Sequence, residues 1–192
     1  MRSSAASDVY KRQNINDPEF HELLVRWFEY GCFCPVMRLH GYRWPLQPQY
    51  GTTGGATCVS GAPNEVWSYT DQVCEILSDY LRLRERMLPY ITELMEEAHE
   101  KGTPVMRPLF YDFPEDKESW NVETEYMFGP KVLVKPITDA DARETDVYLP
   151  GGASWTNAWT GETFEGGQKV HVAAPIEQIP LFTRDGYKLP MK

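Results

Sequence analysis

The sequence predicts an α/β part followed by an all-β part. The first observation is an amphipathic stretch over residues 70–101 that leads directly into a short apolar run at residues 105–110. A long helix that feeds a buried strand is the repeating unit of a parallel sheet or barrel. The second observation is a series of short strand-like segments separated by Gly-containing turns after Trp120, which is typical of an antiparallel sandwich or barrel. The change of architecture is therefore predicted near Trp120.

Composition limits the classes of partner. The formal net charge of −9 argues against nucleic acid, whose phosphates require clustered Lys and Arg. No apolar run approaches the roughly 20 residues that a membrane span needs, so no membrane partner is expected. Aromatic residues make up 13% of the chain. Stacking on sugar rings and ordinary core packing both account for such a content.

The four cysteines do not form a recognisable zinc site. Cys32 and Cys34 form a C-x-C pair, but no second C-x-x-C or His pair completes the ligand set. We interpret all four as free, largely buried thiols of a reducing compartment, which favours a cytoplasmic location. No phosphate-cradling glycine loop or dinucleotide fingerprint is present either, so neither a metal nor a cofactor is expected.

Residues 1–13 are interpreted as a non-native or disordered leader. They are rich in Ser and Ala and lack helical or strand periodicity. Residues 3–13 resemble the in-frame translation of a transposon adapter used in sequencing libraries. In that case the natural protein begins upstream of Asn14 and the chain is a truncated reading of it. The alternative is an ordinary disordered N-terminus. On either interpretation this segment is predicted to make no packed contacts.

The first predicted helix leads to a pair of candidate site residues. Asp17 is a suitable N-cap, Pro18 fits the first helical position, and Gly31 ends the apolar helical pattern. A short apolar run then ends at Arg38 and His40. In barrels of parallel strands, active-site groups lie where strands end. A hydrogen-bonded structural histidine is the alternative interpretation of His40.

A long loop follows over residues 42–67. It is rich in Gly, Pro, Thr and Gln, and it carries Trp44, Tyr50 and Trp67. Loops of this length inside compact domains are usually functional or disordered. The aromatic residues favour a partly ordered lid or rim.

The long helix is predicted to start after a cap at Ser68 or Thr70 and to end at Gly102, which tolerates the left-handed C′ position. Pro89 lies inside it and removes one backbone hydrogen bond. We therefore expect a bend near Glu85.

The second part is predicted to be antiparallel. Turns are expected at residues 150–152, 160–162 and 166–167, where glycine occurs. Predicted strands cover residues 131–137, 145–149, 154–159, 163–164, 169–173 and 179–184, with a turn or short strand at residues 125–129.

Residue patterns alone contain no complete catalytic set, because the nucleophile-elbow and phosphate-binding motifs are missing from the sequence. Several segments in order nevertheless resemble glycoside hydrolase family 31, the α-glucosidase and α-xylosidase family. They are RWFEYGCFCPVMRLHG, LRLRERMLPYITELMEEAHEKGTPVMRPLFYDFPED, EYMFGPKVLVKPI and VYLPGGASWTNAWTGETFEGG.

The resemblance implies the C-terminal portion of a (β/α)8 TIM barrel over residues 14–120, followed by an antiparallel β-sandwich domain over residues 121–192. It also implies a retaining mechanism, in which two carboxylates about 5–5.5 Å apart act as nucleophile and as acid/base. In the family both are aspartates on earlier barrel strands. They are therefore expected upstream of Asn14, and no residue of this chain is assigned a catalytic role.

The resemblance also implies substrate-binding residues. His40 matches the family histidine that hydrogen-bonds hydroxyl groups of the sugar at the cleavage subsite, which an imidazole can do as donor or acceptor. Trp44 and Trp67 are expected to shape the outer sugar subsites. Arg38 belongs to the same candidate site, with a carboxylate as its expected partner. Arg107, if buried, must be paired with an acidic group or with backbone carbonyls at the barrel core.

The leading hypothesis is a fragment of a retaining α-glycosidase that removes terminal α-linked xylose or glucose from oligosaccharides and is inactive by itself. Transglycosylases and glucan lyases share the same motifs and stay open, as does a homo-oligomeric state of the full-length parent. The alternative from another class is a non-catalytic carbohydrate-binding or interaction module.

Overall fold

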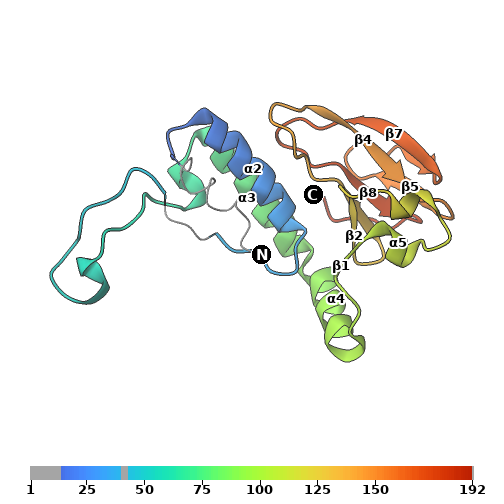
Figure 1. The fold of residues 1–192 in the computed structure, drawn as a ribbon, viewed down its shortest axis with the longest axis horizontal. Helices are drawn as coiled ribbons and strands as arrows, with labels where there is room; N and C mark the ends of the chain where they lie inside the picture. The colour runs from blue at the N-terminus through green and yellow to red at the C-terminus, as the bar shows by residue number, and fades with distance from the viewer. Residues whose placement is uncertain (1–13, 40–42, 192) are drawn as a thin grey trace.

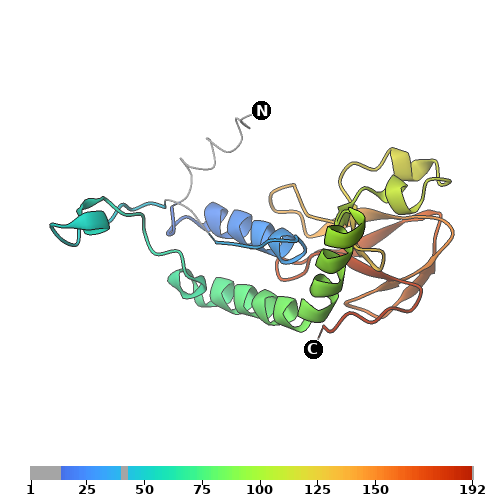
Figure 2. The same cartoon turned by 90° about the horizontal axis from the view of Figure 1, so that it is seen from below.

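In the computed structural model, which describes residues 14–39 and 43–191, a layer of helices lies beside a sheet-rich half (Figure 1). Helices α2 (Pro18–Cys32) and α3 (Asp71–Arg86) lie side by side. Helix α4 (Leu88–Lys101) turns away from the axis of α3 (Figure 2). The leader expected over residues 1–13 lies outside the described residues.

The predicted helix caps are confirmed. The Asp17 carboxylate accepts a hydrogen bond from the Glu19 backbone N–H at 3.0 Å, and Pro18 follows as the first residue of α2. Helix α2 extends through Gly31 and ends at Cys32. Of the two candidate caps for α3, Thr70 is the one used, since its hydroxyl accepts from the Val73 N–H at 3.3 Å.

The predicted single bent helix over residues 70–101 is wrong, because the chain breaks at Met87 into α3 and α4. A proline at position 89 cannot donate to the Glu85 carbonyl, and its ring clashes with that carbonyl in a continuous helix. After the break, Pro89 lies in the first turn of α4, where no donor is needed. The Met87 side chain is buried in the corner. Gly102 ends α4 with φ of +72°, as expected.

All pairs of named strands in residues 14–39 and 43–191 are antiparallel. One sheet has six strands in the order β1-β2-β3-β8-β5-β6, and the other pairs β4 with β7. The antiparallel character predicted for the second part is therefore confirmed. The strands are β1 (Met106–Arg107), β2 (Tyr126–Phe128), β3 (Val132–Val134), β4 (Glu144–Leu149), β5 (Ser154–Asn157), β6 (Thr163–Glu165), β7 (Gln168–Ala173) and β8 (Leu181–Arg184).

The run at residues 105–110 is not the parallel strand that its apolar character predicted. Only Met106 and Arg107 form a strand, and they pair antiparallel with Phe128 and Met127 of β2. Pro108 has no N–H to continue the ladder, and the short helix α5 (Leu109–Asp112) starts immediately after it. The part of the chain that the structure describes thus shows no ladder between parallel barrel strands.

The central strands β2, β3 and β8 of the six-stranded sheet are buried on both faces. Successive residues of β2 alternate, so that Phe128 packs among the helices while Met127 faces the β4–β7 pair. On β3, Val132 and Val134 likewise contact the helical cluster, and Leu133 belongs to the other. Burial on both faces explains why these strands are apolar at consecutive positions. The helices and the sheet therefore share one hydrophobic layer.

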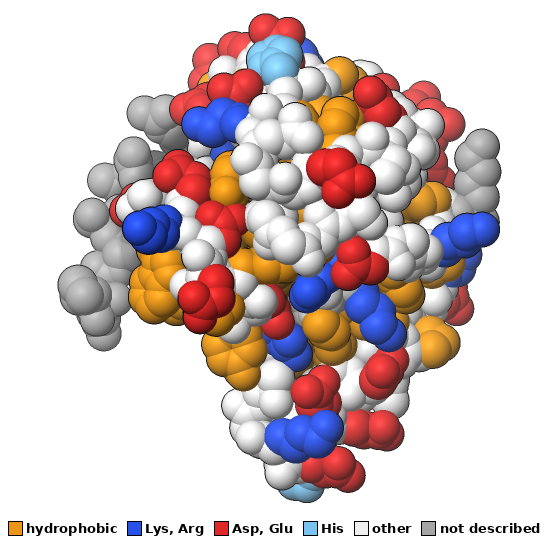
Figure 3. All heavy atoms as spheres, turned by 90° about the vertical axis from the view of Figure 1, so that its right-hand side faces the viewer, with side chains coloured by type: hydrophobic (Ala, Val, Ile, Leu, Met, Phe, Trp, Pro, Cys, Tyr) orange, Lys and Arg blue, Asp and Glu red, His pale blue; other side chains and the backbone are white. Residues whose placement is uncertain are grey.

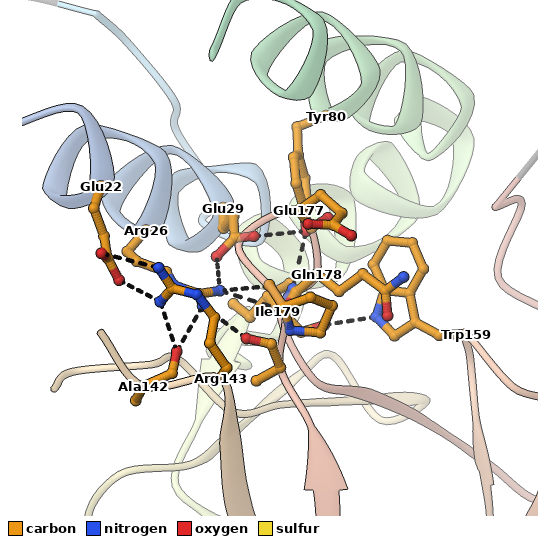
Figure 4. A network of polar contacts seen from close by, with 12 residues as sticks. Glu22, Arg26, Glu29, Tyr80, Ala142, Arg143, Trp159, Glu177, Gln178 and Ile179 are labelled. Atoms are coloured by element: carbon orange, nitrogen blue, oxygen red, sulfur yellow. Dashed lines mark hydrogen bonds and ion pairs between the residues drawn. The ribbon is translucent and has the colours of Figure 1, made fainter. Parts of the chain in front are cut away.

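A buried arginine joins α2 to the sheet-rich half (Figure 4). The Arg26 guanidinium is 8% exposed and donates to Glu29 Oε2 at 3.0 Å. Its remaining donors reach backbone carbonyls far along the chain, at Ala174 (2.8 Å), Ala142 (3.1 Å), Pro175 (3.2 Å) and Gln178 (3.4 Å). These carbonyls belong to loops of the β half. The position of α2 thus depends on the fold of residues more than a hundred positions away.

Glu29 and Tyr80 extend this contact to α3. The Tyr80 hydroxyl lies 3.1 Å from Glu29 Oε1 and accepts a hydrogen bond from the Ile179 N–H at 3.0 Å. Burial raises the pKa of Glu29 to about 7, although the charge of Arg26 opposes that shift. Desolvation is the largest influence on this pKa, and it outweighs the charge and hydrogen bond of Arg26 and the hydrogen bond of Tyr80.

Seen from the sheet end, acidic, basic and hydrophobic side chains are interspersed over the surface (Figure 3). The negative charge is thus spread over this face. Trp120 remains 58% exposed although its ring stacks on Phe110 at 4.6 Å between centroids.

Replacing Arg26 by Met is predicted to lower the free energy of unfolding by about 3–5 kcal/mol, because it leaves Glu29 and four carbonyls without their donor in a buried site. Urea unfolding measures the change. Arg82→Met is the matched control, since Arg82 also pairs at i,i+3 spacing, with Asp79 at 2.8 Å, but both side chains are exposed. Its cost should stay within about 0.5 kcal/mol. Equal costs for the two variants would contradict the role given to Arg26.

The stability of the chain should fall as pH rises from about 4.5 through 7. A carboxyl whose pKa is raised in the folded state, as that of Glu29 is, favours folding while protonated and loses this contribution on ionisation. The loss for Glu29 is at most about 3 kcal/mol. Glu29→Gln should reduce the slope, measured by urea unfolding at several pH values, and Glu75→Gln on the exposed face of α3 should leave it unchanged. Burial also raises the pKa of Glu125 to about 7, so part of the slope should persist.

Gly129→Ala should destabilise the fold by about 3 kcal/mol or more, because its φ is +60° and a Cβ there would overlap the Tyr90 hydroxyl and the Leu94 side chain. Gly152→Ala is the control. Its φ is +85°, but a Cβ there meets nothing within 4 Å, so only backbone strain of about 1 kcal/mol is expected. Thermal unfolding of both variants separates overlap from strain. A similar loss in the two would show that packing against α4 contributes nothing.

Candidate functional site

The candidate substrate-binding residues lie on the segment that follows α2. His40 lies outside the described residues. The Arg38 side chain is exposed and forms no ion pair with a carboxylate in residues 14–39 and 43–191, so its expected partner is not found there. Trp44 is half-exposed, and its backbone carbonyl accepts from the Ile15 N–H at 3.1 Å. The structure therefore holds Trp44 by its backbone and leaves its ring accessible.

The turn before Arg38 is bound by two side chains from distant elements. Arg84 of α3 donates to the carbonyl oxygens of Cys32 (2.7 Å), Cys34 (2.8 Å), Pro35 (3.0 Å) and Gly31 (3.5 Å). Tyr126 of β2 donates to the Phe33 carbonyl at 3.0 Å. Neither residue was singled out from the sequence. Their importance depends on which backbone they face, and a lone Arg in a helix or a Tyr in a short strand carries no local signal for that.

Arg43 anchors the other side of the segment. Its guanidinium is 5% exposed and lies over the Phe20 ring, 5.4 Å from the centroid. Its carbonyl accepts from the Ala62 N–H at 2.8 Å. Arg43 also opposes the rise that burial causes in the pKa of Tyr69. Sequence reasoning placed Arg43 in a loop and missed that it is buried.

The long loop projects away from the helices (Figure 1). It contains the short 3-10 helices η1 (Gly54–Thr57) and η2 (Val66–Ser68), and Gln47 and Ser60 form an isolated bridge across it. Tyr50 and Trp67 are each more than 70% exposed. Exposed aromatic rings at this position could stack on a sugar, as the lid or rim interpretation requires.

Arg107 is buried and paired, as predicted for a buried arginine. It donates to Asp112 Oδ1 at 3.1 Å and to the Pro104 carbonyl at 2.7 Å, and Glu97 lies 3.9 Å away. These partners belong to α4, α5 and the chain between them, and Arg107 itself is part of the antiparallel sheet. Its expected position in a barrel strand is therefore wrong.

The cysteines are free, as expected, but only Cys32 is fully buried, and Cys58 is exposed. Burial raises the pKa of the Cys32 thiol to about 12, and burial also raises that of Cys34. Both thiols are thus protonated at neutral pH. Within residues 14–39 and 43–191 the structure shows no group of three His, Cys, Asp or Glu side chains arranged for a metal.

Two buried carboxyl groups of the described residues, those of Glu29 and Glu125, and the partly buried one of Asp112 are engaged in contacts that hold the fold. Glu29 meets Arg26, Asp112 meets Arg107, and Glu125 accepts from the Tyr148 N–H at 3.1 Å. None of the three is positioned as one of two carboxylates facing a shared cleft. In the described part of the candidate segment, the exposed Arg38 side chain can donate hydrogen bonds to a ligand, and the half-exposed Trp44 ring can stack on one.

None of the helices within the described ranges combines the length and apolar character that a membrane span requires.

Comparison with known proteins assigns both parts of the chain to one family. Residues 10–94 match the model of the glycosyl hydrolases family 31 TIM-barrel domain, and residues 102–189 match that of the glycosyl hydrolase family 31 C-terminal domain. The two matches follow one another without overlap.

Relatives and solved structures agree. The chain is 36% identical over 178 residues to an α-xylosidase of Saccharolobus solfataricus, covering 93% of this chain and 22% of that protein. The fold is similar to that of a family 31 α-xylosidase from a soil metagenome, solved with xylose, at 47% identity and a TM-score of 0.86, covering 92% of this chain and 26% of that one. It is also similar to a dextranase of Flavobacterium johnsoniae, solved with glucose, at 30% identity and a TM-score of 0.75, covering 91% and 20%.

The chain thus spans about a quarter of the length of the proteins that it matches. Over nearly its whole described length it follows both the sequence and the fold of these enzymes, and the family resemblance predicted from its motifs is confirmed. The chain belongs to glycoside hydrolase family 31.

Proposed function

We propose that this chain is part of a retaining α-glycosidase that removes terminal α-linked xylose or glucose from oligosaccharides. The observation that carries the proposal is the match of 92% of the chain, at a TM-score of 0.86, to an α-xylosidase solved with xylose. The order of the motifs on both sides of the candidate segment supports it.

Substrate contacts are assigned to the segment after α2. His40 would hydrogen-bond sugar hydroxyls, and such bonds strengthen as positive charge develops on the sugar ring in the transition state. Arg38 and Trp44 would line the same subsite or the next one. Their exposure in the described structure supports this role.

The nucleophile and the acid/base are proposed to lie in sequence outside this chain. The engagement of Glu29, Asp112 and Glu125 by partners within the fold supports this proposal, because a catalytic carboxylate must face the sugar. The present chain would then supply part of the sugar-binding wall and the C-terminal domain.

An α-xyloside is the first substrate to test. An α-xylosidase of Saccharolobus solfataricus is 36% identical, one of Aspergillus niger is 37% identical, and the soil-metagenome α-xylosidase is 47% identical. α-Glucosides come second, since an α-glucosidase of Bacillus thermoamyloliquefaciens is 36% identical.

The division of the chain at residue 120 remains our prediction, and limited proteolysis would test it. An earlier division, at the end of α4, is supported by the gap between the two family matches at residues 94 and 102 and by the pairing of β1 with β2.

The isolated chain is predicted to show no turnover of aryl α-xyloside or aryl α-glucoside. Placed as residues 14–191 into the soil-metagenome α-xylosidase, in place of the matching segment, it should support turnover. In that chimera His40→Ala should lower kcat/KM by about 100-fold or more, because several transition-state hydrogen bonds are lost. His99→Ala, at the exposed end of α4, is the control and should change nothing.

Turnover by the isolated chain would contradict the proposed absence of the catalytic carboxylates. Unchanged kcat/KM in His40→Ala would contradict the role of His40. Saccharide binding by the isolated chain, combined with an inactive chimera, would instead favour the non-catalytic binding module.

A further inference from the structure

Five consecutive backbone carbonyls, those of residues 31–35, accept hydrogen bonds from two side chains that are remote in sequence. Arg84 reaches four of them and Tyr126 reaches the fifth, that of Phe33. The last carbonyls of a helix have no partner within it, so they must find donors elsewhere. Here α3 and β2 provide those donors.

The chemistry of Arg84 suits this task. A guanidinium carries five donors in one plane, and Nη1 and Nη2 of Arg84 divide four carbonyls between them. A lysine ammonium is a compact point charge and cannot span the same set. A neutral side chain of similar length would lose the attraction between the cation and the negative end of α2.

The Tyr126 contact comes from the sheet-rich half. Its ring packs edge-on against Tyr30 near the end of α2, with centroids 6.0 Å apart, while its hydroxyl donates to Phe33. Val134, opposite Tyr126 on β3, lies in the core cluster shared with the helices. The turn is thus held from two directions, by a helix and by the C-terminal sheet.

This double anchor lies directly before the candidate substrate residues. Met37 packs against the helical core cluster, and Arg38 follows with its side chain exposed. Residues 36–39 have no regular secondary structure of their own. Their direction is therefore set by the anchored turn.

We infer that Arg84 and Tyr126 are positioning residues that hold the turn at residues 31–35 and thereby direct Arg38, which follows that turn, toward the sugar. Through Tyr126 the C-terminal domain takes part in sugar binding without touching the sugar. The part of this inference that concerns sugar rests on the proposed function, and the part that concerns the backbone does not.

The backbone part is tested on the 192-residue chain. In Arg84→Lys, hydrogen exchange at the Phe33 and Cys34 amides, which bond to Tyr30 and Gly31, should accelerate by about tenfold or more. Order parameters from ¹⁵N relaxation should fall at residues 36–39. Tyr126→Phe removes only the hydroxyl and should give a smaller change of the same kind, about fivefold.

Two matched controls accompany these variants. Arg82→Lys changes an exposed arginine on the same helix, and Tyr111→Phe changes a half-exposed tyrosine. Neither should alter exchange at Phe33 and Cys34. Unchanged hydrogen exchange and order parameters in Arg84→Lys would overturn the inference. An equal acceleration of exchange at the core amides of α3 would also overturn it, since it would indicate general destabilisation of the fold.

The sugar part is tested in the chimera by a double-mutant cycle on an aryl α-xyloside. Arg84→Lys should lower kcat/KM by about tenfold, and the double variant with Arg38→Ala should be no worse than Arg38→Ala alone, because Arg84 acts through the direction of Arg38. If His40→Ala has no effect, the proposed function fails. If Arg38→Ala is impaired while Arg84→Lys is not, or if the losses of these two variants add, the positioning role fails.

Discussion

The burial of positively charged guanidinium groups against backbone carbonyls is the constraint on which the rest of this structure depends. Arg26 lies between α2 and the loops of the β half, where it meets four carbonyls and Glu29. A buried cation that loses its acceptors is strongly unfavourable. The helices and the loops at residues 142 and 174–178 must therefore be in place together.

Two arginines of α3, the partly buried Arg84 and the exposed Arg86, also donate to backbone carbonyls. Arg84 binds the carbonyls at the end of α2, and Arg86 donates to those of Pro190 and Met191 near the C-terminus at 2.8 Å each. In each case a helix contributes the charge, and the end of another helix or a chain segment without regular structure contributes the oxygens. Such segments have carbonyls to spare, because no ladder or helix uses them. The arginines thereby hold in place backbone segments that lack regular secondary structure and whose conformation hydrophobic packing alone would not define.

This arrangement connects the fold to the proposed sugar site. The central strands of the sheet are buried on both faces, so β2 contributes side chains both to the helical core and to the core shared with β4 and β7. Tyr126 lies on that strand and reaches the turn before Arg38. The C-terminal sheet is therefore part of the support for the candidate segment.

The sequence by itself determined the local features. Caps at Asp17, Thr70 and Gly102 follow from side-chain and backbone preferences that neighbouring residues set, and the glycine-separated strands follow from their turns. The family motifs, with their order along the chain, pointed to the same enzymes that the comparisons found.

Only the tertiary structure decided which remote groups meet. The antiparallel pairing of Met106 and Arg107 and the carbonyls that Arg84 binds involve partners outside any local window. A short apolar run looks the same in the sequence whether its strand pairs parallel or antiparallel. Likewise, the sequence around a helical arginine does not show whether its side chain faces water or the backbone of a turn. The neighbouring strand or the accepting carbonyl groups distinguish these possibilities, and their positions depend on the whole fold.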